Sequence, residues 1–181
     1  MGNEHGSSRR GFLRTSLMGA AAASWVGGKR TIAAQTGALR LGGPVFEKYR
    51  DPQGWVDALR KLGYSAVYCP VGPDAGDDAV RAYEDAAAKA GIIIAEVGAW
   101  SNPISPDEQT RKAAIEKCRT HLALADRIGA RCCVNIAGSR SEKWDGPDAA
   151  NFTKQTFDMI VETTRSIIDE VKPARTYFTL E

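Results

Sequence analysis

The sequence predicts an α/β fold in which a parallel sheet is covered by helices. From residue 39 onward, short apolar runs alternate with amphipathic stretches that have helical spacing. Near-continuous apolar strands separated by helices are typical of parallel sheets, whose strands are joined by crossover helices. Hydrophobic residues make up 43% of the 181-residue chain and charged residues 25%, which indicates one globular domain or part of one.

Five apolar runs are the expected strands, and four helical patterns separate them. Three junctions repeat one order: a basic residue, a small or apolar residue, a glycine, then a strand. Gly63, Gly91 and Gly129 are therefore expected to end helices in the left-handed conformation, whereas Pro173 marks the fourth junction. The expected strands are 39–46, 64–70, 92–100, 131–138 and 175–181; the helical patterns cover 55–62, 80–90, 115–125 and 157–171.

The segment 105–108, Ser-Pro-Asp-Glu, has the pattern of a helix start. Ser105 is the expected N-cap, Pro106 fits the first helical position, and Glu108 lies three residues after the cap.

Two architectures fit five such units: a doubly wound sheet, or the first five units of an eight-stranded (β/α)8 barrel. Each strand shows one apolar face and one face that turns polar toward its C-terminal end. In the third strand, alternation places Ile94 with Glu96; in the fifth, it places Thr179 with Glu181. A doubly wound sheet would bury both glutamates under helices at a high cost. The barrel, with helices on the outer face only, is therefore preferred.

Residues 1–38 have the pattern of a twin-arginine signal peptide with its linker, although a flexible basic terminus is the simpler alternative. Arg9 and Arg10 follow a serine and precede Gly-Phe-Leu, and a weakly apolar run covers 17–26. This run is too short to span a bilayer after processing. We therefore expect 39–181 to be exported to the periplasm after folding, with the twin-arginine export machinery as a partner.

Composition argues against nucleic-acid binding and against a zinc site. Without residues 1–34 the chain holds 19 basic and 21 acidic residues, so no basic patch is expected. The four cysteines, at 69, 118, 132 and 133, show neither a CxxC motif nor a Cys/His spacing. Buried small apolar side chains are the simpler interpretation of these thiols.

The segment 90–139 resembles the sugar phosphate isomerase/epimerase family, which has the xylose isomerase-like TIM barrel. The resemblance lies in the turn GAWSNP after the third strand and in the helix that leads through RIGA into the fourth. It covers about 39–181, and its motifs mark the superfamily rather than a substrate. It implies a (β/α)8 barrel of which this chain holds about five units, with the chain ending at the family's first metal ligand.

The resemblance implies that Glu181 binds a divalent metal, such as Mn²⁺, Mg²⁺ or Co²⁺, and acts in proton transfer beside a carbonyl that the metal polarises. The other ligands, an Asp, a His and a second Glu, belong to later strands that this sequence lacks. The 181-residue chain is therefore expected to bind metal weakly and to show no isomerase turnover alone. A solvated chain end is the alternative interpretation of Glu181.

Five further residues fit either a role in the site or a role in the framework. Trp100 is expected to stack on a sugar or to pack under its loop. Asn102 and Asn135 are candidates for binding substrate hydroxyls, Asn135 on the lumen face with Cys133, or else for satisfied core amides. Glu96 is expected to be a structural acid held by hydrogen bonds, and His121 a helical packing residue far from any strand end.

The expected function is metal-dependent isomerisation or epimerisation of a small sugar or sugar phosphate, a reaction of carbohydrate metabolism. One alternative is a non-catalytic sugar-binding or structural module derived from the barrel. A second is endonuclease IV-like hydrolysis, which expects more His and Asp ligands and a basic surface than the sequence offers. The resemblance leaves the substrate, the metal and oligomerisation open.

Overall fold

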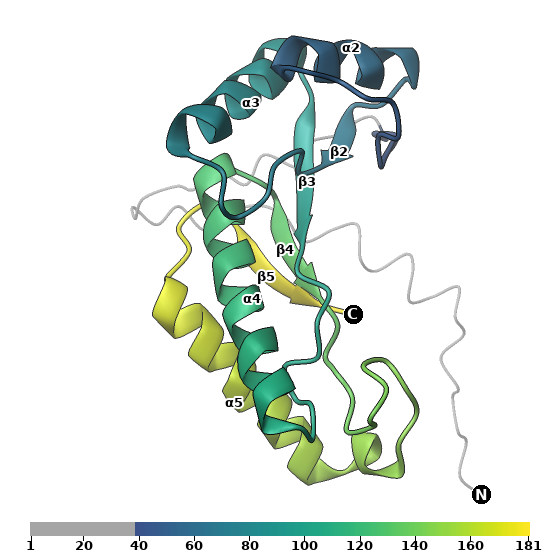
Figure 1. Cartoon of the computed structure of the whole chain (residues 1–181), viewed down its shortest axis with the longest axis vertical. Helices are drawn as coiled ribbons and strands as arrows, with labels where there is room; N and C mark the ends of the chain where they lie inside the picture. Colours follow the sequence, from purple (N-terminus) through teal and green to yellow (C-terminus); the bar gives the residue numbers. More distant parts are fainter. Residues whose placement is uncertain (1–38) are drawn as a thin grey trace, which may run out of the picture. The chain divides into compact units, whose positions relative to one another are not determined.

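The computed structural model describes residues 39–181, which form a five-stranded parallel sheet with helices against it (Figure 1). The strands lie in the order β1-β2-β3-β4-β5, and every neighbouring pair is parallel. Their bounds are β1 Gly42–Gly43, β2 Ala66–Tyr68, β3 Ile93–Gly98, β4 Cys132–Asn135 and β5 Tyr177–Leu180. All five expected strands are present, and each is shorter than its apolar run.

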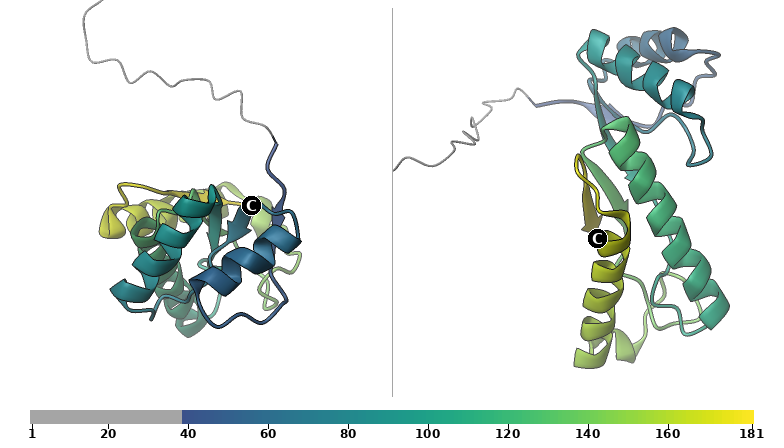
Figure 2. Two further views of the ribbon diagram at one scale, coloured as in Figure 1. Left: turned by 90° about the horizontal axis from the view of Figure 1, so that it is seen from above. Right: turned by 90° about the vertical axis from the view of Figure 1, so that its left-hand side faces the viewer.

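The helices follow the predicted alternation with the strands. They are α2 Pro52–Lys61, α3 Asp77–Ala90, α4 Glu108–Ile128 and α5 Lys154–Val171, with a short 3₁₀ turn at Ala149–Phe152. Because the strand order never reverses and crossovers are right-handed, all connecting helices lie on one face of the sheet (Figure 2). A doubly wound sheet needs a reversal of strand order, so the barrel arrangement is confirmed over the doubly wound alternative.

The three junction glycines adopt the expected conformation. Gly63, Gly91 and Gly129 have φ of 69°, 68° and 70°. The fourth junction differs from the prediction, because Lys172 adopts the left-handed conformation with φ 52° and Pro173 only follows it. A proline cannot take a positive φ, so the residue before it makes the turn.

The predicted start of α4 was wrong by two residues. Asp107 is the N-cap, and its carboxylate accepts a hydrogen bond from the Thr110 N–H at 2.7 Å. Ser105 instead belongs to the preceding turn, where its N–H bonds to the Asn102 carbonyl and its own carbonyl accepts from Arg111. An aspartate at the cap also places a negative charge at the positive end of the helix dipole.

The core lies between the sheet and the helices, and a β-bulge in β3 decides which side chains enter it. Val67 pairs with Ile94 but Tyr68 pairs with Glu96, so Ala95 is the extra residue. Ile94 and Val97 are both buried in this core. The expected alternation, which placed Ile94 with Glu96, was therefore wrong: the bulge turns Ile94 toward the helices and leaves Glu96 beside Tyr68 on the opposite face.

Within 39–181, no helix combines the length and the apolar character that crossing a membrane requires. The proposed signal peptide lies outside the described residues.

Candidate active site

The face of the sheet opposite the helices carries four side chains near the C-terminal ends of its strands, which we call the mouth site: Tyr68, Glu96, Trp100 and Glu181. The register places Glu96 level with Cys132 and Tyr177, and Gly98 level with Val134 and Thr179. Glu181 therefore lies nearer to the C-terminal edge than Glu96. In parallel α/β folds this edge is where ligands bind.

Trp100 is placed by its backbone and by the glycine two residues before it. Its φ is 34°, in the left-handed region that favours glycine. The indole then lies against Gly98, where a Cβ would be 2.6 Å from Cδ1 of the ring. The Lys117 ammonium donates to the Trp100 carbonyl at 3.3 Å, and the side chain is 42% exposed. An exposed indole on a strand end is a surface on which a sugar ring can stack.

Glu181 is fixed by its backbone. Its N–H donates to the Asn135 carbonyl and its own carbonyl accepts from the Ala137 N–H, both at 3.0 Å. These two bonds continue the β4–β5 pairing past the end of each strand. The carboxylate of Glu181 is thus carried by a residue that belongs to the sheet, and the side chain is exposed.

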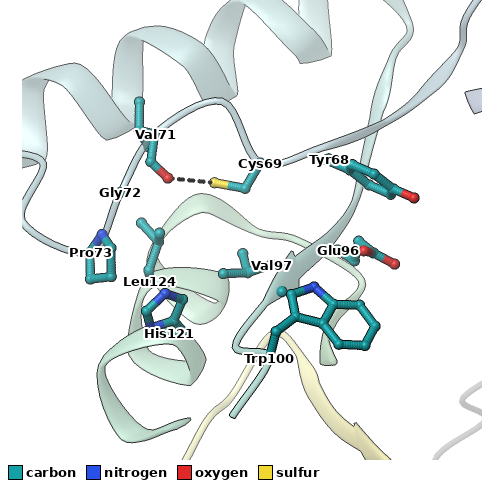
Figure 3. Close-up of a pocket in the computed structure, with 11 residues that line it drawn as sticks. Tyr68, Cys69, Val71, Gly72, Pro73, Glu96, Val97, Trp100, His121 and Leu124 are labelled. Atoms are coloured by element: carbon teal, nitrogen blue, oxygen red, sulfur yellow. Dashed lines mark hydrogen bonds between the residues drawn. The ribbon is translucent and has the colours of Figure 1, made fainter. Parts of the chain in front are cut away.

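Glu96 differs from the expected structural acid. It is half-buried, and among the hydrogen bonds of residues 39–181 none involves its carboxylate. Burial raises the pKa of Glu96, and the charge of Glu181 raises it further. Glu96 lies with Tyr68 and Trp100 at one end of a cleft, where its carboxylate can meet a ligand (Figure 3).

Asn102 is part of the framework that supports Trp100. It is buried, and its amide donates to the Ser139 carbonyl at 2.7 Å. Its carbonyl oxygen accepts from the N–H groups of Ser139 at 2.9 Å and of Ile104 at 3.3 Å. Asn102 thereby joins the loop after β3 to the loop after β4. A direct contact with substrate stays a prediction.

Asn135 lies on the helix-covered face, so the expectation that it faces the lumen was wrong. Cys133, on the same face, is buried in the core with Leu122 of α4. The Asn135 side chain is fully buried, and its oxygen accepts from the Ser101 N–H at 2.8 Å. This bond fixes the residue next to Trp100. Its role in binding substrate also stays a prediction.

His121 was expected to lie far from any strand end, and the structure corrects this. A cleft of about 410 Å³ reaches from the mouth site to α4, and His121 lines it together with Val97 and Gly98 at the end of β3 (Figure 3). The sequence offered no signal for this contact, because it arises where the loop after β2 meets the middle of a long helix. Burial lowers the pKa of His121.

The thiols agree with their simpler interpretation. Cys118 and Cys133 are fully buried, Cys69 and Cys132 are half-buried, and all four are free. Burial raises the pKa of Cys133 to about 12.

The described residues do not complete a metal centre. No group of three or more His, Cys, Asp or Glu side chains in 39–181 is arranged to hold a metal ion. Glu96 and Glu181 supply two carboxylates, whereas a catalytic metal is held by about three protein ligands.

Solved structures with the same fold include sugar epimerases. The D-psicose 3-epimerase of Clostridium cellulolyticum H10, crystallised with D-tagatose, superposes with a TM-score of 0.53 at 20% identity, over 73% of this chain and 47% of the epimerase. The 3-keto-D-glucoside 4-epimerase of E. coli gives 0.52 at 9% identity, over 76% of this chain and 53% of that one. A D-psicose 3-epimerase in the presence of D-fructose gives 0.52 at 16% identity, over 70% and 45%.

These similarities establish the fold, and the chain spans about half the length of the structures that it matches. No curated protein matches the sequence. The profile of one protein family, described as "Xylose isomerase-like TIM barrel", matches residues 56–181, which is most of the chain. The chain therefore belongs to the xylose isomerase-like TIM barrel family.

Proposed function

We propose that this protein acts in the metal-dependent isomerisation or epimerisation of a sugar. It supplies two carboxylates of the active site and the Trp100 indole, which we call the aromatic wall, as the surface that binds the sugar. The observation that carries the proposal is an exposed indole beside Glu96 on the helix-free face (Figure 3), with Glu181 on the same face at the C-terminal edge of the sheet. Structures with this fold include epimerases of small sugars, which supports the same reaction class.

In the proposed role, Trp100 stacks on the apolar face of a sugar and Tyr68 limits how far the sugar can move along the sheet. Glu181, at the edge, is the base that takes a proton from a carbon beside a carbonyl. Glu96 holds a proton more readily than an isolated glutamate, so it is suited to hydrogen-bond a sugar hydroxyl. Both carboxylates come from rigid strands, which fixes the direction of proton transfer.

A divalent metal would polarise the carbonyl in the whole enzyme, and Glu181 is the residue proposed to bind it. The described residues supply two carboxylates, whereas a catalytic metal needs about three ligands. The proposal is therefore tested by measuring sugar binding rather than turnover. A non-catalytic sugar-binding module remains the second candidate, because the aromatic wall alone would suffice for it.

The test compares D-fructose with D-mannitol, which has the same carbon skeleton but no carbonyl, by saturation-transfer NMR on the purified chain. Both sugars are expected to lose binding in Trp100→Ala and to keep it in Trp144→Ala, an equally exposed tryptophan outside the mouth site. D-Fructose is expected to bind better, and Glu181→Gln to remove that preference.

The outcomes separate the candidates. Trp100-dependent binding without any preference for the ketose favours the non-catalytic module. Absence of binding by either sugar, or binding that Trp100→Ala leaves intact, overturns the proposed site. Deuterium exchange from D₂O into the ketose, recorded in the same samples with Mn²⁺, reports whether this chain carries a reaction step.

We also propose that residues 1–38 direct export of the folded protein by the twin-arginine route to the periplasm. The support is the order of the paired arginines, the Phe-Leu pair and the apolar run in the sequence.

A further inference from the structure

The cleft beside the mouth site offers more room than stacking on Trp100 alone requires. It continues from Glu96 and Trp100 to four residues that we call the side cleft: Val71 and Pro73 from the loop after β2, and His121 and Leu124 from α4. Figure 3 shows Tyr68, Glu96 and Trp100 gathered at one end and the side cleft at the other. The whole cleft is about 410 Å³, which is within the range of small-molecule sites.

The side cleft is apolar apart from one imidazole. His121 Nδ1 lies 2.8 Å from the Lys117 carbonyl oxygen, and a carbonyl only accepts, so Nδ1 carries the hydrogen. The neutral ring then keeps Nε2 as an acceptor, and no hydrogen bond within 39–181 uses this atom. A group bound there meets three apolar side chains and one acceptor.

The charge of the cleft selects against anionic ligands. Among residues 39–181, no lysine or arginine lines it, and its one carboxylic acid is Glu96. Lys117 on α4, four residues before His121, is exposed and donates to the Trp100 carbonyl. A phosphate bound in the cleft would find no lysine or arginine side chain among the described lining residues with which to pair.

We propose that the side cleft binds an uncharged apolar or aromatic substituent of the sugar, so that the substrate is a sugar that carries such a substituent and keeps a carbonyl elsewhere, rather than a sugar phosphate. The proposal rests on the proposed function, because it places the sugar itself on Trp100 beside Glu96. The substituent would lie between Pro73 and Leu124, with any hydroxyl it carries donating to His121.

The test measures binding of phenyl β-D-glucoside, methyl β-D-glucoside and glucose 6-phosphate to the purified chain by calorimetry. The phenyl compound is expected to bind roughly 10-fold or more tightly than the methyl compound, because a phenyl ring buries far more apolar area. Glucose 6-phosphate is expected to bind more weakly than either.

Gly72→Leu is chosen to fill the side cleft from the loop after β2. Gly72 is exposed and lines the cleft, and a Cβ there meets only the end of the Asp74 side chain, at 2.8 Å. We expect this variant to bind the two glucosides equally. Gly76→Leu is the matched control: it lies in the same loop, has open space at its Cβ and does not line the cleft, so it should keep the phenyl preference.

The outcomes distinguish failure of the side-cleft inference from failure of the proposed function. Equal binding of both glucosides by the unmodified chain, a phenyl preference that survives in Gly72→Leu, or tighter binding of glucose 6-phosphate overturns the side-cleft inference. If both glucosides still lose binding in Trp100→Ala, the proposed function stands without it. Binding that is absent, or that does not depend on Trp100, removes the proposed function and the side-cleft inference together.

Discussion

The indole of Trp100 occupies the space that a side chain on Gly98 would need. A Cβ on Gly98 would lie 2.6 Å from Cδ1 of the indole and 3.2 Å from Cε2, and both are ring atoms that cannot move independently. Because Gly98 has no side chain, the Trp100 indole can lie against β3. The absence of one methyl group in the strand therefore determines where the indole proposed to stack on a sugar can lie.

Gly98→Ala should displace the indole and weaken sugar binding about as much as Trp100→Ala, by roughly 10-fold, since stacking on one aromatic ring contributes about 1–1.5 kcal/mol. The double variant should be no weaker than either single variant, because both changes remove the same contact. Saturation-transfer NMR with D-fructose measures this cycle. Additive losses would show that Gly98 and Trp100 act independently.

The sequence predicted the order of the strands and the helix ends, because these depend on local chemistry. Gly63, Gly91 and Gly129 sit where a positive φ is needed, and apolar runs mark the buried strands. Glu181 could be named as a site candidate from the family resemblance, and Trp100 from its place at the C-terminal end of a predicted strand; both roles stay predictions. The remaining site residues depend on contacts that no periodicity shows.

Two errors have specific physical causes. The bulge at Ala95 shifts the alternation of β3, and nothing in the run IIIAEVG distinguishes the extra residue from its neighbours. His121 reaches the cleft because α4 has 21 residues and passes the loop that follows β2. Helical spacing placed His121 beside the apolar stripe but could not tell which loop would meet it.

The unusual backbone conformation of Trp100 should lower the free energy of unfolding. At φ 34° an L-residue is strained and glycine is not. Trp100→Gly should therefore be more stable than Trp100→Ala, by about 1 kcal/mol in the free energy of unfolding measured with urea. At Tyr68, a β2 residue without a positive φ, the same pair should rank the other way, with alanine more stable. An identical ranking at both positions would contradict the strain.

Asn102→Ala should destabilise the protein by about 3 kcal/mol, because it removes three hydrogen bonds and leaves buried backbone groups of Ser139 and Ile104 unpaired. Urea unfolding measures the loss, and limited proteolysis should cut the loops after β3 and β4 faster. Gln109→Ala, an exposed amide near the start of α4, is the control and should change stability by less than about 0.5 kcal/mol. A loss below about 1 kcal/mol for Asn102→Ala would show that the loops hold together without it.

Export should depend on the paired arginines. Replacing Arg9 and Arg10 with lysine should stop transport of a folded reporter fused after Ala38, because the twin-arginine pattern is read as an address. Fractionation of periplasm and cytoplasm measures the result. A reporter preceded by Arg14→Lys alone, outside the pair, should still be exported. Transport of the doubly substituted fusion at the unmodified rate would refute the assignment.

His121 should make the stability of the protein depend on pH. Burial holds the pKa of His121 below its ordinary value of 6.5, and the nearby charge of Lys117 adds to this, while the bond to the Lys117 carbonyl opposes it. The unfolded chain therefore binds this proton more readily than the folded chain. The contribution is fully present above about pH 6.5 and is lost as the pH falls toward the lowered pKa.

The test is urea unfolding of the unmodified chain and of His121→Gln at several values between pH 7.5 and 5. Glutamine does not titrate, so the variant should lose less stability on acidification, and the two curves should converge as the pH falls. Arg165→Gln, an exposed change on α5, should follow the unmodified chain because it leaves the imidazole in place. Parallel curves for the unmodified chain and His121→Gln would mean that the cleft leaves the imidazole as well solvated as it is in the unfolded chain.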